Sequence, residues 1–191
     1  MSKKAFYFNA YVVLYEKRVI KRIYGGGCVK LIITDIVDFK PNISDEYHVV
    51  APQKNAIVPC VGCFGCWTKT PGECLIKDGY SSVAARIGKC DELVIVSKCF
   101  YGGFSPFVKN VLDRAIGYIL PDFVIRNGVM KHKSRYGNTM RVSACFYGEN
   151  ISDAEKSTAK RIVRANAENY NAKLGKVEFC RSAEETAGVC F

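Results

Sequence analysis

The stretch Leu93-Val94-Ile95-Val96 decides the fold, because an unbroken apolar run of this length is typical of a strand that is buried on both faces of a parallel sheet. Ahead of it, Asp78 is placed to cap a helix whose apolar positions are Val83, Ala84 and Ile87. The stretch and its preceding segment therefore predict one helix-strand unit of an α/β fold.

The same unit recurs downstream. Ser105 is a helix-cap candidate followed by Pro106, and the stripe behind it predicts a helix ending at Pro121, with apolar positions Val108, Val111, Leu112, Ala115, Ile116 and Ile119. Residues 141–146 form the next predicted strand. Ser152 and Glu155 form a capping box for a last helix that we expect to end at Gly175, with core positions Ala159, Ile162, Val163, Ala167 and Tyr170.

The outer strands and one hairpin complete the pattern. Residues 29–35 read as the opening strand, residues 47–51 as a second strand and residues 177–180 as the last one. The connector over residues 36–46 is barely long enough for a parallel crossover, so its helix is short or missing. Asn127-Gly128 predicts a hairpin within residues 123–133. This order predicts an α/β fold with a mainly parallel sheet between helices.

The chain divides into a domain over residues 29–181, an N-terminal extension over residues 1–28 and a tail over residues 182–191. The extension carries six basic residues against one acidic residue, which is half of the formal net charge of +10. Its apolar run lacks a signal-peptide cleavage site and is too short to span a bilayer. Three glycines precede Cys28, and we expect the functional polypeptide to begin at Val29.

Composition excludes several classes of protein. A chain of 191 residues with 49% hydrophobic and 24% charged residues suits one globular domain. Nothing indicates secretion, so the ten cysteines are expected to be reduced thiols in the cytoplasm. We expect neither a membrane nor a nucleic-acid partner, and interpret the basic cluster as a solvated face, with residues Lys131, His132, Lys133 and Arg135.

Four cysteines lie close together in the sequence, namely Cys60, Cys63, Cys66 and Cys74. Thiolates are soft ligands suited to zinc or to iron and sulfide, and three cysteines at successive two-residue gaps resemble a ferredoxin run more than a zinc knuckle. Gly62 and Gly65 allow the backbone to approach an inorganic centre. Ordinary thiols on a tight loop are the alternative.

Two loops at the carboxyl ends of predicted strands are rich in aromatics and glycine. The first runs from Lys98 to Ser105, and the second contains Tyr147 and Gly148. Ligands of open parallel sheets bind at this edge, where an aromatic ring can cover a flat ligand and glycine lets backbone amides approach its polar rim. For any single aromatic residue, core packing is the alternative.

Taken together these motifs resemble the flavodoxin-like NAD(P)H-dependent FMN reductases, and within them the iron-sulfur flavoproteins. The resemblance covers roughly residues 29–181. It rests on Val58-Pro59-Cys60-x-Gly62-Cys63-x-x-Cys66, Pro71-Gly72-x-Cys74-x-x-x-Asp78 and Tyr101-Gly102-Gly103-x-Ser105-x-x-x-Lys109-x-x-x-Asp113-Arg114.

The resemblance implies a flavodoxin-like, doubly wound sheet of five parallel strands with helices on both faces, and a homo-oligomer. It implies a [4Fe-4S] cluster on the four cysteines of the run, although some relatives with similar cysteines are regarded simply as FMN reductases. FMN would lie at the strand edge, with contacts from Tyr101, Gly102, Gly103, Phe104, Ser105, Tyr147 and Gly148.

One segment departs from the family pattern. Family members follow the first strand with a loop rich in Ser, Thr, Gly and Arg that binds the FMN phosphate at a helix N-terminus, whereas this chain has Thr34-Asp35-Ile36-Val37-Asp38. Two aspartates would repel a phosphate dianion. We therefore expect the phosphate to contribute less to binding than is usual.

The interpretation from sequence is an FMN-dependent oxidoreductase with a [4Fe-4S] cluster, NAD(P)H as a possible donor, and a small-molecule or protein redox partner. No general base is assigned, because the cofactors carry the chemistry. Two alternatives remain open: an NAD(P)H-dependent FMN or quinone reductase without a cluster, and a zinc-stabilised binding module that has lost its flavin.

Overall fold

The computed structural model describes residues 29–189. Residues 1–28, which we expect to form an N-terminal extension, lie outside this range. Five parallel strands form the central sheet in the order β2-β1-β3-β6-β7, with bounds β1 Lys30–Thr34, β2 Tyr47–Val50, β3 Glu92–Lys98, β6 Arg141–Tyr147 and β7 Lys173–Cys180. This is the flavodoxin-like strand order, and the predicted fold class is confirmed.

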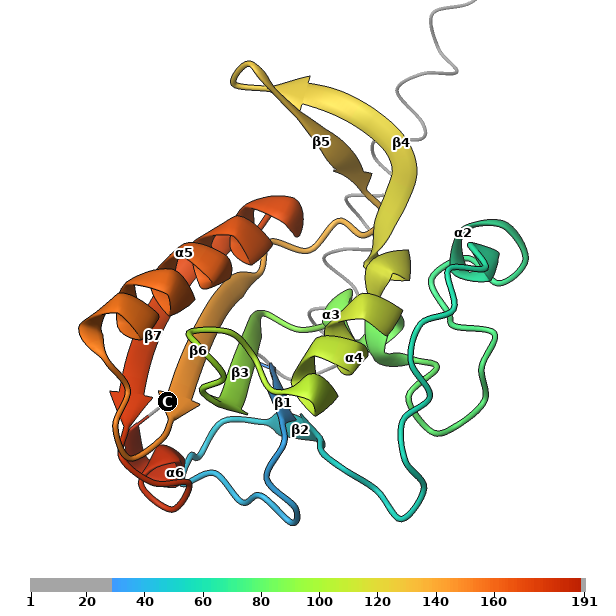
Figure 1. Ribbon diagram of the computed structural model, residues 1–191. Helices are drawn as coiled ribbons and strands as arrows, with labels where there is room; N and C mark the ends of the chain where they lie inside the picture. Colours follow the sequence, from blue (N-terminus) through green and yellow to red (C-terminus); the bar gives the residue numbers. More distant parts are fainter. Residues whose placement is uncertain (1–28, 190–191) are drawn as a thin grey trace, which may run out of the picture.

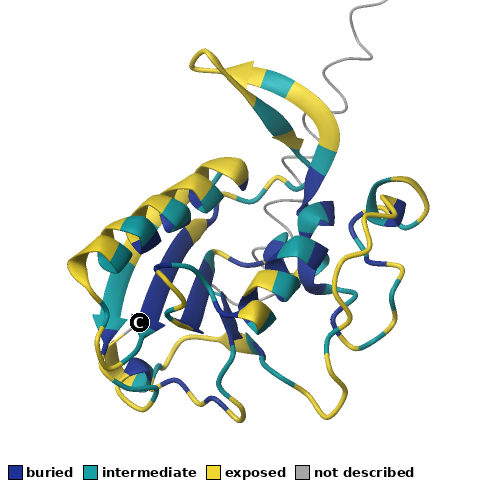
Figure 2. Cartoon of the chain, viewed as in Figure 1, coloured by how far each residue is buried: buried dark blue, intermediate teal, exposed yellow. Residues whose placement is uncertain are grey.

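Three helices cover one face of the sheet (Figure 1), namely α3 Val83–Ile87, α4 Pro106–Arg114 and α5 Asp153–Asn169. The larger part of the core lies beneath them and includes Ile95 and Phe146, neither of which is exposed. Figure 2 shows the buried residues concentrated in the sheet and on the inner sides of these helices.

The other face is covered more thinly. Ile32, Val94 and Val96 point to it, with Phe39 and the partly buried Ala187 packed among the residues of that cluster. Ala187 belongs to the one-turn helix α6 Thr186–Val189, and its carbonyl accepts a hydrogen bond from the Asn42 backbone N–H at 2.9 Å. α6 falls within the segment assigned to a tail, and residues 35–46 contain no helix, so the shortened first crossover is confirmed.

Two of the three predicted helix starts are confirmed by their capping geometry. The Ser105 side chain accepts a hydrogen bond from the Val108 backbone N–H, and Pro106 is the first residue of α4. At α5, Ser152 and Glu155 exchange the reciprocal bonds of a capping box. These bonds satisfy N–H groups that a helix start otherwise leaves without partners.

Three boundary predictions are wrong. Asp78 does not cap α3, whose N-cap is Ser82, because its carboxylate is taken by the buried guanidinium of Arg114. α4 ends at Arg114 and is followed by the short 3₁₀ helix η1 Ile116–Tyr118, so the apolar stripe continues beyond the helix into a strand. Gly175 does not end α5 but lies within β7, at a register shift opposite Ser143.

The Asn127-Gly128 hairpin is confirmed. It joins β4 Ile119–Arg126 to the antiparallel β5 Val129–Ser134 and projects from the rest of the domain (Figure 1). Asn127 and Gly128 have φ angles of 52° and 76°, as a two-residue turn between twisted strands requires. Four large apolar side chains of the hairpin are exposed, namely Phe123, Ile125, Val129 and Met130.

Candidate functional site

The four clustered cysteines lie on one loop, which we define as the cysteine loop, residues 58–78. The loop contains the single helical turn α2 Gly65–Thr68. Cys60 and Cys63 are exposed, Cys66 is half-buried and Cys74 is buried. The loop therefore presents thiols from solvent inward.

The cysteine thiols influence one another. Burial raises the pKa of the Cys66 thiol, and the neighbouring Cys74, Cys60 and Cys63 raise it further, against a backbone hydrogen bond that lowers it. Such mutual repulsion is what an electropositive centre would relieve. In residues 29–189 as placed, however, no group of three or more Cys, His, Asp or Glu side chains lies close enough to hold a metal ion. Four thiols are a suitable ligand set for a thiolate-bound centre, although their sulfur atoms do not surround a common point in this structure.

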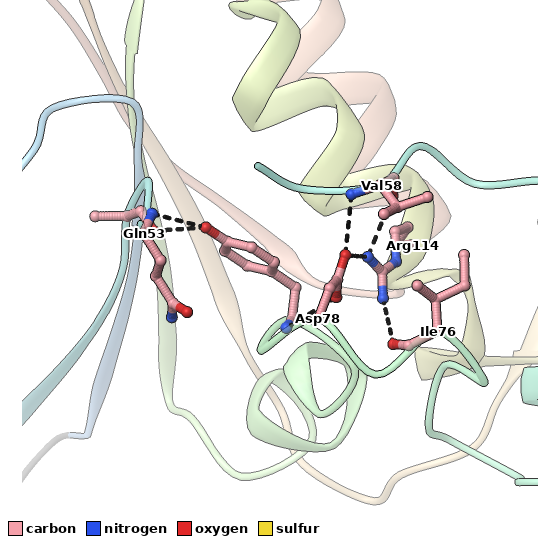
Figure 3. Close-up of polar contacts among 7 residues, drawn as sticks. Gln53, Val58, Ile76, Asp78 and Arg114 are labelled. Carbon is pink, nitrogen blue, oxygen red and sulfur yellow. Dashed lines mark hydrogen bonds and ion pairs between the residues drawn. The ribbon is translucent and has the colours of Figure 1, made fainter. Parts of the chain in front are cut away.

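An ion pair closes the base of the cysteine loop (Figure 3). Asp78 accepts hydrogen bonds from Arg114 and from the Val58 backbone N–H, the latter at 2.9 Å. Arg114 also donates to the Val58 carbonyl at 3.2 Å and to the Ile76 carbonyl at 2.8 Å. Arg114 thus joins the two ends of the loop to the last turn of α4.

Hydrogen bonds to Asp78 hold the pKa of its carboxyl below the ordinary value of 3.8. Burial is the largest single effect and acts in the opposite direction, but the Arg114 guanidinium and the backbone N–H groups of Val58 and Tyr80 outweigh it. Asp78 is therefore charged at neutral pH and paired with a cation.

A second attachment joins the cysteine loop to the start of the hairpin. The Trp67 indole N–H donates to the Ile119 carbonyl at 2.9 Å, and its ring lies 5.7 Å from the ring of His132. Gly117 approaches Cys66 so closely that an added Cβ would lie 3.1 Å from the Cys66 Cβ. The backbone of η1 is therefore packed directly against a proposed ligand.

The cysteine loop forms one wall of an open groove of about 860 Å³. α4, α5 and the hairpin form the other walls, and all four cysteines line the groove together with Gly103 and Phe104 from the loop after β3. Pockets of this size commonly bind small molecules. Of the proposed flavin residues, only these two reach the groove that contains the cysteines.

The loop after β3 presents an aromatic tip. Tyr101 is 91% exposed and has a φ angle of 52°, in the left-handed region that disfavours residues with a Cβ. Neither its backbone N–H nor that of Phe104 bonds to another described residue. Phe104 stacks on Phe146 with ring centroids 5.3 Å apart, so it also serves the core.

Two further proposed flavin residues have structural roles. An added Cβ on Gly102 would lie 2.7 Å from the Glu155 carbonyl oxygen, so Gly102 permits close packing against α5. The buried Ser105 caps α4, and its backbone N–H bonds to the Ser97 hydroxyl. These contacts neither require nor prevent a flavin nearby.

A carboxylate links the carboxyl ends of three strands, which sequence reasoning missed. Asp35, after β1, accepts hydrogen bonds from the Lys98 backbone N–H at 3.0 Å and from the Tyr147 hydroxyl at 3.1 Å. Beside it, the Gly148 backbone N–H donates to the Cys180 carbonyl at 3.1 Å. The signal for this link in the sequence was the acidic residue Asp35 directly after the first predicted strand.

The residues after β1 do not fit a phosphate group. No helix begins within residues 35–46, and the Asp35 carboxylate lies at this edge, bonded to the Tyr147 hydroxyl. The basic cluster of the hairpin lies elsewhere, because Asn171, just before the start of β7, donates to the His132 carbonyl at 3.3 Å. That contact places the cluster at the amino ends of the strands. The chain's own basic cluster therefore does not replace the missing phosphate loop.

No family model matches the chain. An iron-sulfur flavoprotein of Methanocaldococcus jannaschii is 24% identical over 89 residues, which is 47% of this chain and 45% of the relative. A second, from Archaeoglobus fulgidus, is 26% identical over 87 residues, covering 46% of this chain and 42% of the relative. The chain is similar to the iron-sulfur flavoproteins.

This finding confirms the resemblance predicted from the motifs. The chain spans less than half the length of the iron-sulfur flavoproteins it matches. Among solved structures, a Trp repressor binding protein of Bacillus subtilis aligns with a TM-score of 0.49, 12% identity and coverage of 85% and 98% of the two chains. An FMN-dependent NADH-azoreductase of Bacillus anthracis, in complex with FMN, aligns with a TM-score of 0.48 and 12% identity. The alignment covers 84% of this chain and 92% of the azoreductase.

Proposed function

We propose that this protein is a flavin-dependent oxidoreductase, with FMN at the carboxyl edge of the sheet and a [4Fe-4S] cluster on the cysteine loop. The observation that carries the proposal is that one helix, α4, begins at the aromatic-glycine loop and ends at the base of the cysteine loop, in a flavodoxin-like sheet. The similarity to iron-sulfur flavoproteins supports the same assignment.

The loop after β3 and the loop after β6 would hold the flavin ring. Tyr101 would cover one face of the ring, and the N–H groups of Tyr101 and Phe104 are available to its polar rim. The remaining contacts are proposed from Gly102, Gly103, Ser105, Tyr147 and Gly148. When bound, FMN supplies two-electron exchange with a nicotinamide or quinone-type partner.

The ligands of the cluster would be Cys60, Cys63, Cys66 and Cys74. When bound, a [4Fe-4S] cluster supplies single-electron transfer. The protein's own contribution is to fix the loop through Arg114 and Trp67 and to hold Cys74 away from water.

The redox partner would be a small molecule or a protein. The groove beside the cysteines has walls of mostly apolar side chains, and Lys109 and Lys131 lie on it, which suits a flat, partly anionic acceptor. We also propose a homo-oligomer and no nucleic-acid or membrane partner. In residues 29–189, no helix has the length and apolar character needed to cross a bilayer.

Two observations favour the alternative functions. The thiols are not converged on one point, which favours an FMN or quinone reductase that carries no cluster. The misfit between the residues after β1 and a phosphate favours a zinc-stabilised binding module without flavin.

Analysis of anaerobically purified, iron-replete protein separates these functions. The proposal predicts bound flavin, about four iron and four sulfide per chain, and reduction of the flavin by NADH or NADPH. Flavin without iron would establish the reductase without a cluster. Zinc without flavin or sulfide would establish the binding module.

A further inference from the structure

Arg114 carries a buried nitrogen that has no hydrogen-bond partner among the described residues. The residue is 2% exposed, and its two terminal nitrogens bond to Asp78, Val58 and Ile76. Its Nε is buried and bonds to none of residues 29–189. Because leaving a buried charged donor unsatisfied is costly, such an atom calls for a partner.

The position of Arg114 indicates what that partner is. Arg114 donates to the Ile76 carbonyl, two residues beyond Cys74, and both Arg114 and Cys74 line the groove beside the cysteine loop. Cys74 is the buried member of the four cysteines. The unsatisfied donor therefore lies at the inner end of the proposed ligand set.

A second guanidinium shows the same feature at the hairpin end of the cysteine loop. Arg135 Nε donates to the Gly117 carbonyl at 2.7 Å, and Arg135 Cδ would lie 3.4 Å from a Cβ added to Gly72. Its Nη2 is buried and also lacks a partner. Within residues 29–189, these two nitrogens are the only buried side-chain N or O atoms without a hydrogen-bond partner. Both arginines lie against the cysteine loop, Arg114 at Ile76 and Asp78 and Arg135 at Gly72.

Charge explains why such donors would be held here. Four thiolates bring several negative charges into a partly buried site, and a metal or iron-sulfur core neutralises only part of them. An N–H donor directed at sulfur stabilises the more negative state, so hydrogen bonds to the sulfurs raise the reduction potential of a cluster.

A purely structural role does not account for Arg114. The two loop carbonyls and Asp78 occupy only its terminal nitrogens. Asp78 offsets the charge of Arg114 but gives its Nε no acceptor. An occupied cysteine loop would supply sulfur as that acceptor.

We propose that Arg114 is a positioning residue for the centre on the cysteine loop, and that its Nε–H donates a hydrogen bond to the sulfur at Cys74. This inference rests on the proposed ligand role of the cysteines. It adds that the buried end of the centre is electrostatically tuned by α4, whereas the ends at Cys60 and Cys63 face solvent.

The test compares three changes of the ion pair with one control. Arg114→Lys keeps the charge and removes the Nε donor. Asp78→Asn with Arg114→Gln replaces the pair by neutral groups of similar size, which limits the loss of stability. Asp78→Asn alone keeps the guanidinium. Arg164→Gln, on the exposed side of α5 and outside the groove, is the control for the loss of one positive charge.

Two measurements are made on each variant: a spectroscopic redox titration of the reconstituted cluster, and Co²⁺ binding to the apoprotein followed by thiolate-to-cobalt charge-transfer absorption. We expect Arg114→Lys and the double variant to shift the potential to more negative values. The double variant should also bind Co²⁺ at least about tenfold more weakly. Asp78→Asn should keep or raise the potential, and Arg164→Gln should leave both readouts unchanged.

Unchanged potential and Co²⁺ affinity in the double variant would overturn the inference. Failure of the proposed function has a different signature. A wild-type protein that binds Co²⁺ through thiolates but never takes up iron and sulfide contradicts the cluster, and the Co²⁺ series then decides the role of Arg114. A wild-type protein that binds no Co²⁺ through thiolates overturns both.

Discussion

The Tyr147 hydroxyl donates a hydrogen bond to the Asp35 carboxylate at 3.1 Å, across the carboxyl ends of β6 and β1. Burial, together with the charge of Asp35, raises the pKa of Tyr147 far above its ordinary value. Tyr147 therefore remains a donor across the physiological pH range, and the pair holds a negative charge at the edge where a flavin phosphate is expected.

This pair predicts weak discrimination between FMN and riboflavin. Phosphate contacts at a helix N-terminus are absent after β1, so we expect the two flavins to bind the wild-type protein within about tenfold of each other. Asp35→Asn keeps an acceptor for Tyr147 and removes the repulsion. It should raise the affinity for FMN, but not for riboflavin, by an amount on the order of tenfold.

Isothermal titration of apoprotein with both flavins measures these affinities. Asp122→Asn, on the exposed part of the hairpin, is the charge-matched control and should change neither the FMN affinity nor the riboflavin affinity. A strong FMN preference in the wild-type protein that Lys131→Ala and Arg135→Ala abolish would instead show that the basic cluster of a neighbouring subunit binds the phosphate.

The cysteine loop predicts a ligand-specific loss of iron. Replacing Cys60, Cys63, Cys66 or Cys74 with alanine should lower bound iron and sulfide, because each removes one thiolate. Cys90→Ala, a buried cysteine outside the loop, should lower stability but not iron per folded chain. Iron, zinc and sulfide are measured in each purified variant. Stoichiometric zinc without sulfide in iron-replete protein would contradict the cluster assignment.

Tyr101 offers a change that separates binding from stability. Tyr101→Gly removes an exposed ring and relieves a left-handed backbone conformation, so the free energy of unfolding should stay equal or rise by about 1 kcal/mol. Flavin affinity should fall by up to about tenfold, because ring stacking contributes about 0.5–1.5 kcal/mol. Chemical denaturation and flavin titration give the two values, and undiminished flavin binding would remove Tyr101 from the site.

Asp78 predicts a specific acid sensitivity. Its pKa is lowered in the folded protein, so the stability that it contributes is present above its unfolded pKa of about 3.8 and is lost as the pH falls through the lower, folded value. Asp78→Asn should remove this pH-dependent part and cost about 3–5 kcal/mol at neutral pH, because it leaves Arg114 unpaired.

Denaturant unfolding of both proteins between pH 7 and pH 2 measures that loss. The difference in the free energy of unfolding between wild type and Asp78→Asn should shrink as the pH falls. A constant difference across the range would show that the ion pair does not contribute through its charge.

Gly117 provides a steric test of the contact between η1 and the cysteine loop. Gly117→Ala places a Cβ at 3.1 Å from the Cys66 Cβ, and Gly117→Val adds further bulk at the same point. Iron retention during dialysis against a chelator should be lower in Gly117→Ala than in the wild type, and lower still in Gly117→Val, although neither substitution changes a proposed ligand. Gly188→Ala, whose Cβ would meet nothing within 4 Å, should retain iron as the wild type does.

Much of the fold was predictable because its signals are local. The apolar run around Ile95 and the capping box at Ser152 depend on neighbouring residues, and both are confirmed by the structure. The boundary predictions were wrong where tertiary contacts intervene. Asp78 has the residue type of a helix cap, but a buried arginine 36 positions away takes its carboxylate.

The candidate residues of the site could be named from the sequence, but their arrangement could not. Spacing alone singles out the four cysteines as candidates, and it cannot reveal that Cys74 is buried while Cys60 is exposed. The hydrogen bond between Asp35 and Tyr147 joins residues 112 positions apart, and only the parallel order of β1, β3 and β6 brings them together.

The helix α4 has a consequence for how the proposed cofactors would be incorporated. Its nine residues span about 14 Å, with the Ser105 cap at one end and Arg114 at the other. Because the two loops contact opposite ends of this helix, we expect each proposed site to be loaded without the other. Cysteine variants should therefore retain flavin while losing iron, and Tyr101→Gly should retain iron while binding flavin more weakly.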